Sequence, residues 1–94
     1  MPIGFHHYAS SDIEELIRQG IEERGFGIRP TFDGFASRGI SGEPSINVSQ
    51  SNYGTRVEIL SWDNEPIRSL LIEPGDTKSI KKVFQAFDKA RGDL

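Results

Sequence analysis

Two alternating segments on either side of a turn constrain the fold of this chain more than any other feature of its sequence. Residues 45–50 and 55–62 alternate apolar with polar side chains, and residues 51–54 between them have the composition of a tight turn. Pairing Gln50 with Thr55 places the apolar side chains of both segments on one face and the polar ones on the other. We therefore predict an antiparallel hairpin. Its opposed apolar pairs are Val48 with Val57 and Ile46 with Ile59.

Further segments extend this hairpin into a larger sheet. Residues 67–72 form a third strand, and because they end in three apolar residues that face both ways, a central or doubly covered position would explain them. Phe26 and Ile28 alternate ahead of Pro30, which lacks a backbone donor and restricts this segment to a sheet edge. Residues 33–44 are rich in glycine, and we expect an irregular connection there.

A first helix is predicted from about Ser11 to Arg24. Residues 11–14 have the form of a capping box, and Gly25 suits a left-handed helix end. Gly20 costs the helix roughly 1 kcal/mol relative to alanine, and a glycine at this position would let another element approach closely. The first nine residues alternate weakly and predict a short strand or an ordered arm. The apolar stripe of the helix is Ile13, Leu16, Ile17 and Ile21.

A second helix is predicted from about Thr77 to Arg91, with Gly92 as its stop. Its apolar stripe is Ile80, Val83, Phe84 and Phe87. Since neither helix can bury its stripe alone, both must cover one face of the sheet. The expected fold is a single α+β domain spanning residues 1–94, with a three- or four-stranded antiparallel meander sheet flanked by an N-terminal and a C-terminal helix.

Composition excludes several classes of site. The chain has no cysteine, which removes disulfides and thiolate chemistry and suits a reducing compartment. We find no signal peptide and no apolar run of about 18 residues, so we expect a cytoplasmic protein without a membrane segment. His6 and His7 are adjacent and lack a third ligand at helical spacing, so we expect no metal site and no cofactor.

The charge of this mildly acidic chain, −3 overall, is unevenly distributed. Residues 12–24 carry −3, with Glu15 and Glu22 among their acids, whereas residues 76–91 carry +3. Separated charges of this kind steer the association of two proteins. Three lysines open the second helix, namely Lys78, Lys81 and Lys82.

Other candidate contact residues lie in turns. Arg38 lies in the glycine-containing segment 37–42, which could hold a phosphate through its backbone donors but lacks the ending of a P-loop. The interpretation that we favour is a plain flexible connection, and the phosphate-binding loop is the alternative. We expect Tyr53 to be exposed at the hairpin turn, and Trp62 to close the end of the sheet over a helix. The alternative for Trp62 is a half-exposed side chain that anchors a protein contact together with Tyr53.

In its order of helix, three-strand meander and helix, with Lys78, Lys81 and Lys82 opening the second helix, the chain resembles the double-stranded-RNA-binding domain. The resemblance covers about residues 11–91 and implies that these lysines reach phosphates across a groove of the duplex. The chain departs from the family in the stretch before the hairpin, where the glycine-proline-x-histidine loop is absent.

These features predict a small non-enzymatic protein-binding module, such as an inhibitor, an immunity-type or anti-defence protein, or an adaptor. Phage and bacterial inhibitors often have this size and character. The alternative is a nucleic-acid-binding domain. The expected partner is another protein, and the sequence leaves the oligomeric state open, a homodimer included. The expected contact residues are Glu15, Glu22, Arg38, Tyr53, Lys78, Lys81 and Lys82.

Overall fold

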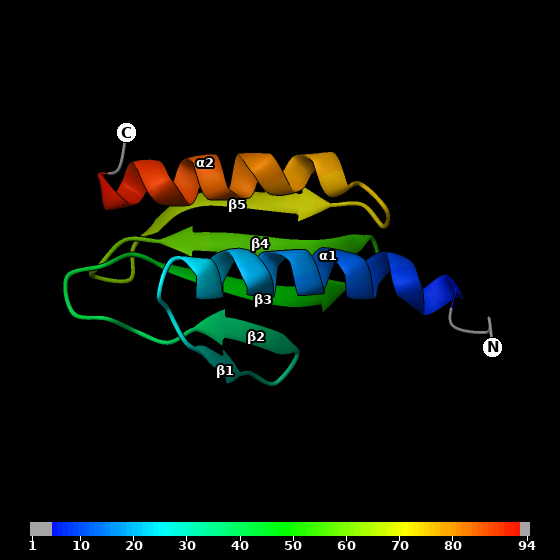
Figure 1. Cartoon of the computed structure of the whole chain (residues 1–94), viewed down its shortest axis with the longest axis horizontal. Coiled ribbons are helices and arrows are strands. Elements are labelled where there is room, and N and C mark those ends of the chain that lie inside the picture. Colours follow the sequence, from blue (N-terminus) through cyan, green and yellow to red (C-terminus); the bar gives the residue numbers. More distant parts are fainter. Residues whose placement is uncertain (1–4, 93–94) are drawn as a thin grey trace.

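A computed structural model describes the backbone of residues 5–92 and the side chains of residues 12–92. Five antiparallel strands form one sheet, and the two helices lie side by side on one of its faces (Figure 1). In chain order the elements are α1 (Phe5–Glu23), β1 (Ile28–Pro30), β2 (Gly34–Ser37), β3 (Ser45–Ser51), β4 (Gly54–Leu60), β5 (Pro66–Ile72), the short 3-10 helix η2 (Thr77–Ser79) and α2 (Ile80–Arg91).

The predicted hairpin is confirmed in its register. Strands β3 and β4 pair with Gln50 opposite Thr55, and the apolar pairs Val48–Val57 and Ile46–Ile59 are completely buried. The strands follow one another across the sheet in sequence order, which makes the sheet a meander. The α+β class and the flanking helices are therefore as expected.

The number of strands differs from the expected three or four because the segment predicted to be irregular contains β2. Phe35 of β2 lies opposite Val48 of β3 and is buried. Gly34 lets the two backbones approach, since a Cβ at this position would lie 2.0 Å from the Val48 carbonyl oxygen. The Ser37 hydroxyl accepts a hydrogen bond of 3.0 Å from the Ile46 amide. These tertiary contacts override the turn-like composition of the segment.

Strand β5 also differs from expectation, because it is an edge strand and not a central one. Its three final apolar residues divide between the two faces of the sheet. Ile72 is buried beneath the helices, whereas Leu71 points to the opposite face and is half-exposed. Strand β1 is the other edge, as its proline predicted.

The first helix begins earlier than expected. Helix α1 already includes Phe5, so Ser11 lies inside the helix, and neither the capping box nor an N-terminal strand over residues 5–9 forms; residues 1–4 lie outside the described residues. No proline or glycine interrupts residues 5–10, so the helix continues through them. The predicted stops are correct, since Gly25 and Gly92 adopt left-handed conformations, with φ of 88° and 83°.

The core lies between the helices and the sheet. Phe84 and Phe87 of α2 are buried, as predicted, and pack edge-to-face with ring centroids 6.5 Å apart. The helices approach closely at Gly20: a Cβ built on Gly20 would lie 2.2 Å from the Phe84 ring. Leu16, expected in the apolar stripe of α1, is instead 38% exposed.

This contact predicts an unusual effect of alanine in a helix. Gly20→Ala should lower the free energy of unfolding by about 1–3 kcal/mol, because the new methyl group overlaps Phe84, although glycine to alanine normally favours a helix by about 1 kcal/mol. Denaturant melts would measure the loss. Gln19→Ala, on the exposed side of the same helix, should change stability by less than about 0.5 kcal/mol. A stabilised Gly20→Ala variant would contradict the close approach.

Candidate functional site

A hollow of about 320 Å³ lies at the end of the sheet where α1 and α2 terminate. Two connections form it, the loop from β2 to β3 and the turn from β4 to β5. Trp62 on this turn is 70% exposed and Ile40 on the loop is 44% exposed. The expectation that Trp62 would close the sheet over a helix is therefore wrong. We call this feature the Trp62 hollow; its lining residues are Gly39, Ile40, Ser41, Gly42, Glu43, Ser45, Ser61, Trp62 and Asn64.

Hydrogen bonds hold the turn that carries Trp62. The Ser61 amide donates to the Glu65 carbonyl at 2.8 Å, and the Asn64 amide donates to the Ser61 carbonyl at 2.9 Å. The Ser61 side chain contacts Asp63 and accepts from the Glu65 amide at 3.2 Å. Asn64 takes a left-handed conformation, which asparagine tolerates well. This backbone is fixed even though Trp62 projects into solvent.

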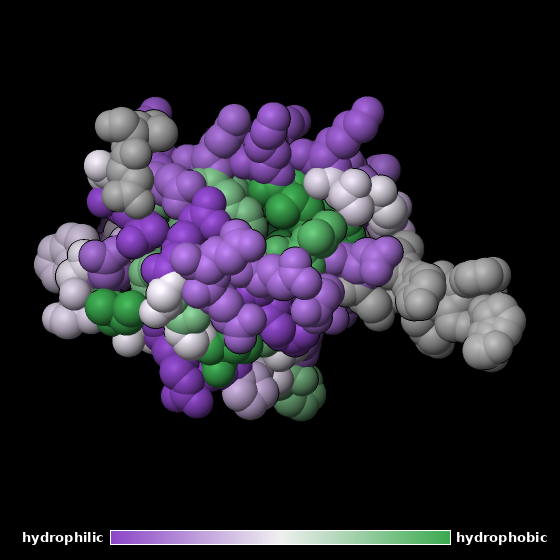
Figure 2. Space-filling model, viewed as in Figure 1, coloured by the Kyte–Doolittle hydropathy of each residue, from purple (hydrophilic) through white to green (hydrophobic). Residues whose placement is uncertain are grey.

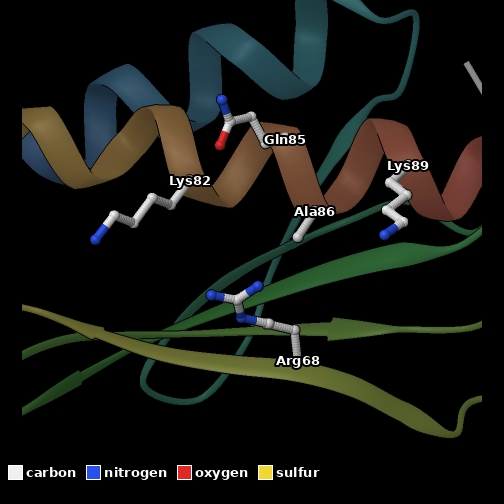
Figure 3. Close-up of a pocket in the computed structure, with 5 residues that line it drawn as sticks. All are labelled: Arg68, Lys82, Gln85, Ala86 and Lys89. Carbon is white, nitrogen blue, oxygen red and sulfur yellow. The ribbon is translucent and has the colours of Figure 1, made fainter. Parts of the chain in front are cut away.

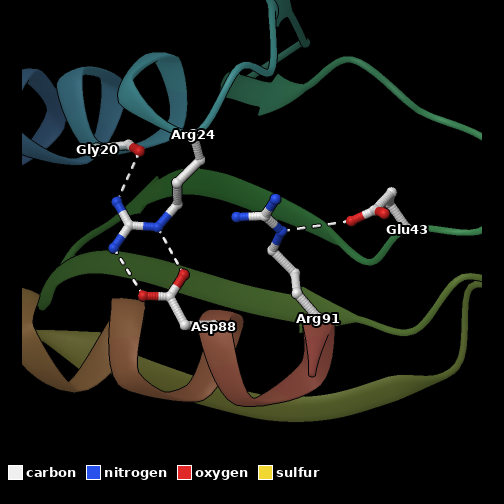
Figure 4. A network of polar contacts seen from close by, with 5 residues as sticks. All are labelled: Gly20, Arg24, Glu43, Asp88 and Arg91. Atoms are coloured by element: carbon white, nitrogen blue, oxygen red, sulfur yellow. Dashed lines mark hydrogen bonds and ion pairs between the residues drawn. The ribbon is translucent and has the colours of Figure 1, made fainter. Parts of the chain in front are cut away.

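The opposite wall of the hollow is anchored to the end of α2. The Glu43 amide donates to the Ile40 carbonyl at 3.0 Å, which closes a turn within the loop. Arg91 donates from Nε to Glu43 Oε1 at 3.3 Å (Figure 4). The Arg91 guanidinium also lies 5.3 Å from the centre of the Phe26 ring, which is buried. The ion pair between Arg91 and Glu43 therefore ties the end of this loop, which was expected to be flexible, to the core.

Beside this anchor, a second ion pair joins the ends of the helices. Arg24, the residue that follows α1, makes two hydrogen bonds to the Asp88 carboxylate, of 2.6 and 2.8 Å, and a third of 2.9 Å to the Gly20 carbonyl (Figure 4). Its guanidinium also stacks 4.2 Å from the centre of the Phe84 ring. The hydrogen bond from Arg24 is the main reason that the pKa of Asp88 lies below its ordinary value of 3.8, and burial partly opposes this shift.

The lowered pKa predicts how the stability contributed by Asp88 depends on pH. Because the folded protein favours the charged carboxylate, this contribution is present above the unfolded pKa and is lost as pH falls through the folded pKa. Asp88→Asn should cost about 1–3 kcal/mol of unfolding free energy at neutral pH. The difference from wild type should shrink below about pH 4. Denaturant melts at several pH values would measure it.

A matched variant tests whether the effect belongs to the ion pair. Asp12→Asn removes a carboxylate from the exposed surface of α1 and should change stability by less than about 0.5 kcal/mol at neutral pH. A cost for Asp88→Asn that stays constant down to about pH 2 would contradict the assignment.

A second surface feature is a groove between α2 and β5 (Figure 3). Two adjoining hollows of about 480 and 330 Å³ form it and share Arg68, Ala86 and Lys89. A bulge in β5 between the pairs Ile59–Arg68 and Leu60–Pro66 leaves Ile67 unpaired and adds it to the groove wall. Lys82 lines the other end. We call this the basic groove, because three cations and no acid line it.

The structure separates several of the residues that the sequence grouped together. Lys82 lines the basic groove, whereas Lys78 and Lys81 do not, although all three lysines are exposed. Glu15 and Glu22 lie on the exposed side of α1. Glu15 also pairs with Arg18 at 3.0 Å.

The remaining predicted contact residues lie apart from the Trp62 hollow. Arg38 is exposed beside Gly27 and does not line the hollow, although its loop does. Tyr53 is exposed, as expected, but at the opposite end of the sheet. Phe32 lies at that same end, at the tip of the β1–β2 turn, and is fully exposed (105%). The sequence analysis did not identify Phe32 as a candidate. It predicted residues 33–44 to be irregular and therefore did not predict the β1–β2 hairpin, whose turn carries Phe32.

Metal-ligating side chains do not gather in the described part of the chain. No group of three or more histidine, aspartate or glutamate side chains there could hold a metal ion. The side chains of His6 and His7 lie outside the described residues. No helix in the described part is long and apolar enough to span a membrane.

Comparison of the chain with protein-family models, with curated proteins and with solved structures returns no match.

Proposed function

We propose that this chain is a small non-enzymatic protein-binding module, in the class of inhibitors, immunity-type or anti-defence proteins and adaptors, and that its partner binds at the Trp62 hollow. The observation that carries this proposal is the exposure of Trp62 and Ile40 on two walls of one hollow. Tryptophan is enriched among the few residues that dominate binding energy in protein interfaces.

The surroundings of Trp62 suit such an interface. Its turn is held by hydrogen bonds, and Arg91 holds the opposite wall, so little backbone freedom is lost when a partner binds. Preorganisation of this kind strengthens binding, because less ordering has to accompany association. Serine and asparagine side chains surround the two apolar residues, which matches the polar rim of a typical interface.

The same lining residues support a non-enzymatic role. Glu43 is the one charged side chain among them, and Arg91 already engages it. General acid–base or nucleophilic catalysis needs an activated group within reach of a second functional group. The hollow therefore has the composition of a contact surface and not of a catalytic centre.

Removing the indole tests this proposal. Trp62→Ala should leave the free energy of unfolding within about 1 kcal/mol of wild type, because the side chain is exposed. It should weaken binding by about 2 kcal/mol or more, roughly thirtyfold. Affinity capture from the source cell identifies a partner for wild type, and calorimetry with the purified partner then measures the change.

Tyr53→Ala is the matched control, since it removes a comparably exposed aromatic side chain from the opposite end of the sheet. It should leave the affinity unchanged. If Tyr53→Ala or Phe32→Ala abolished binding and Trp62→Ala did not, the partner would bind at the other end. A purified chain that turned over a substrate would contradict the non-enzymatic role.

The basic groove favours nucleic-acid binding as a second candidate function. Arg68, Lys82 and Lys89 gather there without an acid among the lining residues, and cations of this kind contact phosphates. The two helices lie on one face of a meander sheet, which agrees with the resemblance to the double-stranded-RNA-binding domain. The sheet has five strands, however, and not the three on which that resemblance was based. Helix α1 lies beside α2 and exposes Glu15 and Glu22, which would repel a duplex laid across both helices.

We therefore expect negligible binding of duplex RNA or DNA at physiological salt. A gel-shift titration measures this directly. Sub-micromolar, salt-sensitive binding that is lost in Arg68→Ala/Lys82→Ala/Lys89→Ala would replace the protein-binding proposal with the nucleic-acid one, and each lost phosphate contact should then reduce the salt slope by about one unit. Lys78→Ala/Lys81→Ala/Lys82→Ala tests the contacts that the resemblance implies.

A further inference from the structure

Helices α1 and α2 run parallel to one another, in a fixed register (Figure 1). Gly20 of α1 lies against Phe84 of α2, and Arg24 one turn later binds Asp88. Both pairs are separated by 64 residues. Each residue of α1 in this region therefore lies level with the residue 64 positions later in α2.

The outer surfaces of the two helices carry opposite charges. On α1, the side away from the buried stripe exposes the acidic stripe, which comprises Asp12, Glu15, Gln19 and Glu22. On α2, the exposed side carries the basic stripe, which comprises Lys78 just before the helix and then Lys82, Gln85 and Lys89, and the last three of these also line the basic groove. In each stripe two charged residues seven positions apart flank a glutamine. By the rise of a helix, seven residues correspond to about 10.5 Å.

A seam that holds the apolar side chains of Leu16 and Ile80 lies between the two stripes, and the exposed charges of Glu23 and Lys81 lie at its edges. Leu16 is one turn before Gly20 on α1, so it faces α2 and is 38% exposed. Ile80 is one turn before Phe84 on α2 and is partly exposed. Figure 2 shows hydrophobic surface between the helices with hydrophilic surface on both sides. An apolar centre with a charged rim is the usual anatomy of a protein interface.

We propose that this helix face binds a second copy of the chain, around a two-fold axis that runs along the seam parallel to the helices. Rotation about such an axis places α1 of each copy on α2 of the other. It leaves the position of every residue along the helix direction unchanged. Glu15, level with residue 79, then lies between Lys78 and Lys82 of the second copy. Glu22, level with residue 86, lies between Lys82 and Lys89 of that copy.

Charge selects this arrangement over the alternative. A two-fold axis in the same plane but perpendicular to the helices would place acidic stripe on acidic stripe and basic on basic. Along the seam, Leu16 and Ile80 of both copies meet at the axis, and the opposite charges on either side lie at the rim. Within one chain, the acidic stripe of α1 is aligned with the basic stripe of α2. The two-fold axis reproduces this alignment between the copies, so the stripes of a second copy are complementary in both charge and position.

Two charge-reversal variants test the arrangement. Glu15→Lys/Glu22→Lys makes both stripes basic, and Lys82→Glu/Lys89→Glu makes both acidic. Wild type should dimerise in sedimentation equilibrium at low ionic strength. Its dissociation constant should rise about tenfold or more between ~50 mM and ~500 mM salt, because added salt shortens the Debye length and weakens the attraction between the stripes. Each variant alone should be monomeric. An equimolar mixture of the two should form heterodimers.

Matched controls exclude a general effect of charge. Arg29→Glu/Arg56→Glu changes the net charge as much as Lys82→Glu/Lys89→Glu, but on the opposite face of the sheet, and should still dimerise. Trp62→Ala should also dimerise, so failure of the partner proposal and failure of this one are distinguishable. Wild type that stays monomeric at about 1 mM would refute the inference. So would a dimer that survives both reversals, or variants that do not associate when mixed.

Discussion

The packing of both helices on one face of the sheet is the constraint from which the other features follow. Gly20 lets the Phe84 ring lie against α1. Arg24 donates two hydrogen bonds to Asp88, and the Arg24 guanidinium stacks on the Phe84 ring. These contacts fix the register of the helices, and the apolar sheet surface beneath them supplies the burial that stabilises both. A shift of either helix by one turn would break the ion pair and expose the phenylalanine ring.

This helix layer determines where the candidate interaction surfaces lie. The helices cover one face of the sheet, and the connections at its two ends carry exposed aromatic side chains, Trp62 at one end and Tyr53 at the other. Arg91, at the end of α2, links the core to the loop that forms one wall of the Trp62 hollow. Parallel packing also places an acidic helix beside a basic one, so the charge pattern becomes a property of one continuous surface.

The sequence predicted the parts of the fold that depend on local patterns. Alternation from Ser45 to Trp62 was sufficient for the central hairpin and its register, since a slip of one residue would expose Val48 and Val57. It was insufficient for β2, whose four residues are ordered by pairing with β3. For the candidate site, the sequence singled out Trp62 but predicted that it would be buried. Exposure depends on which elements end near a residue, and no local pattern encodes this.

By itself, the sequence determined the α+β class, the central hairpin, both helix ends at glycine and the separation of charge between the terminal helices. These are local properties, set by periodicity, backbone preference and composition. The tertiary structure alone decided that β2 joins the sheet and that β5 is an edge. It also decided that the loop and the Trp62 turn form one hollow, and that the acidic and basic stripes lie level with each other. Those outcomes depend on contacts between residues far apart in the chain, where packing outweighs local preference.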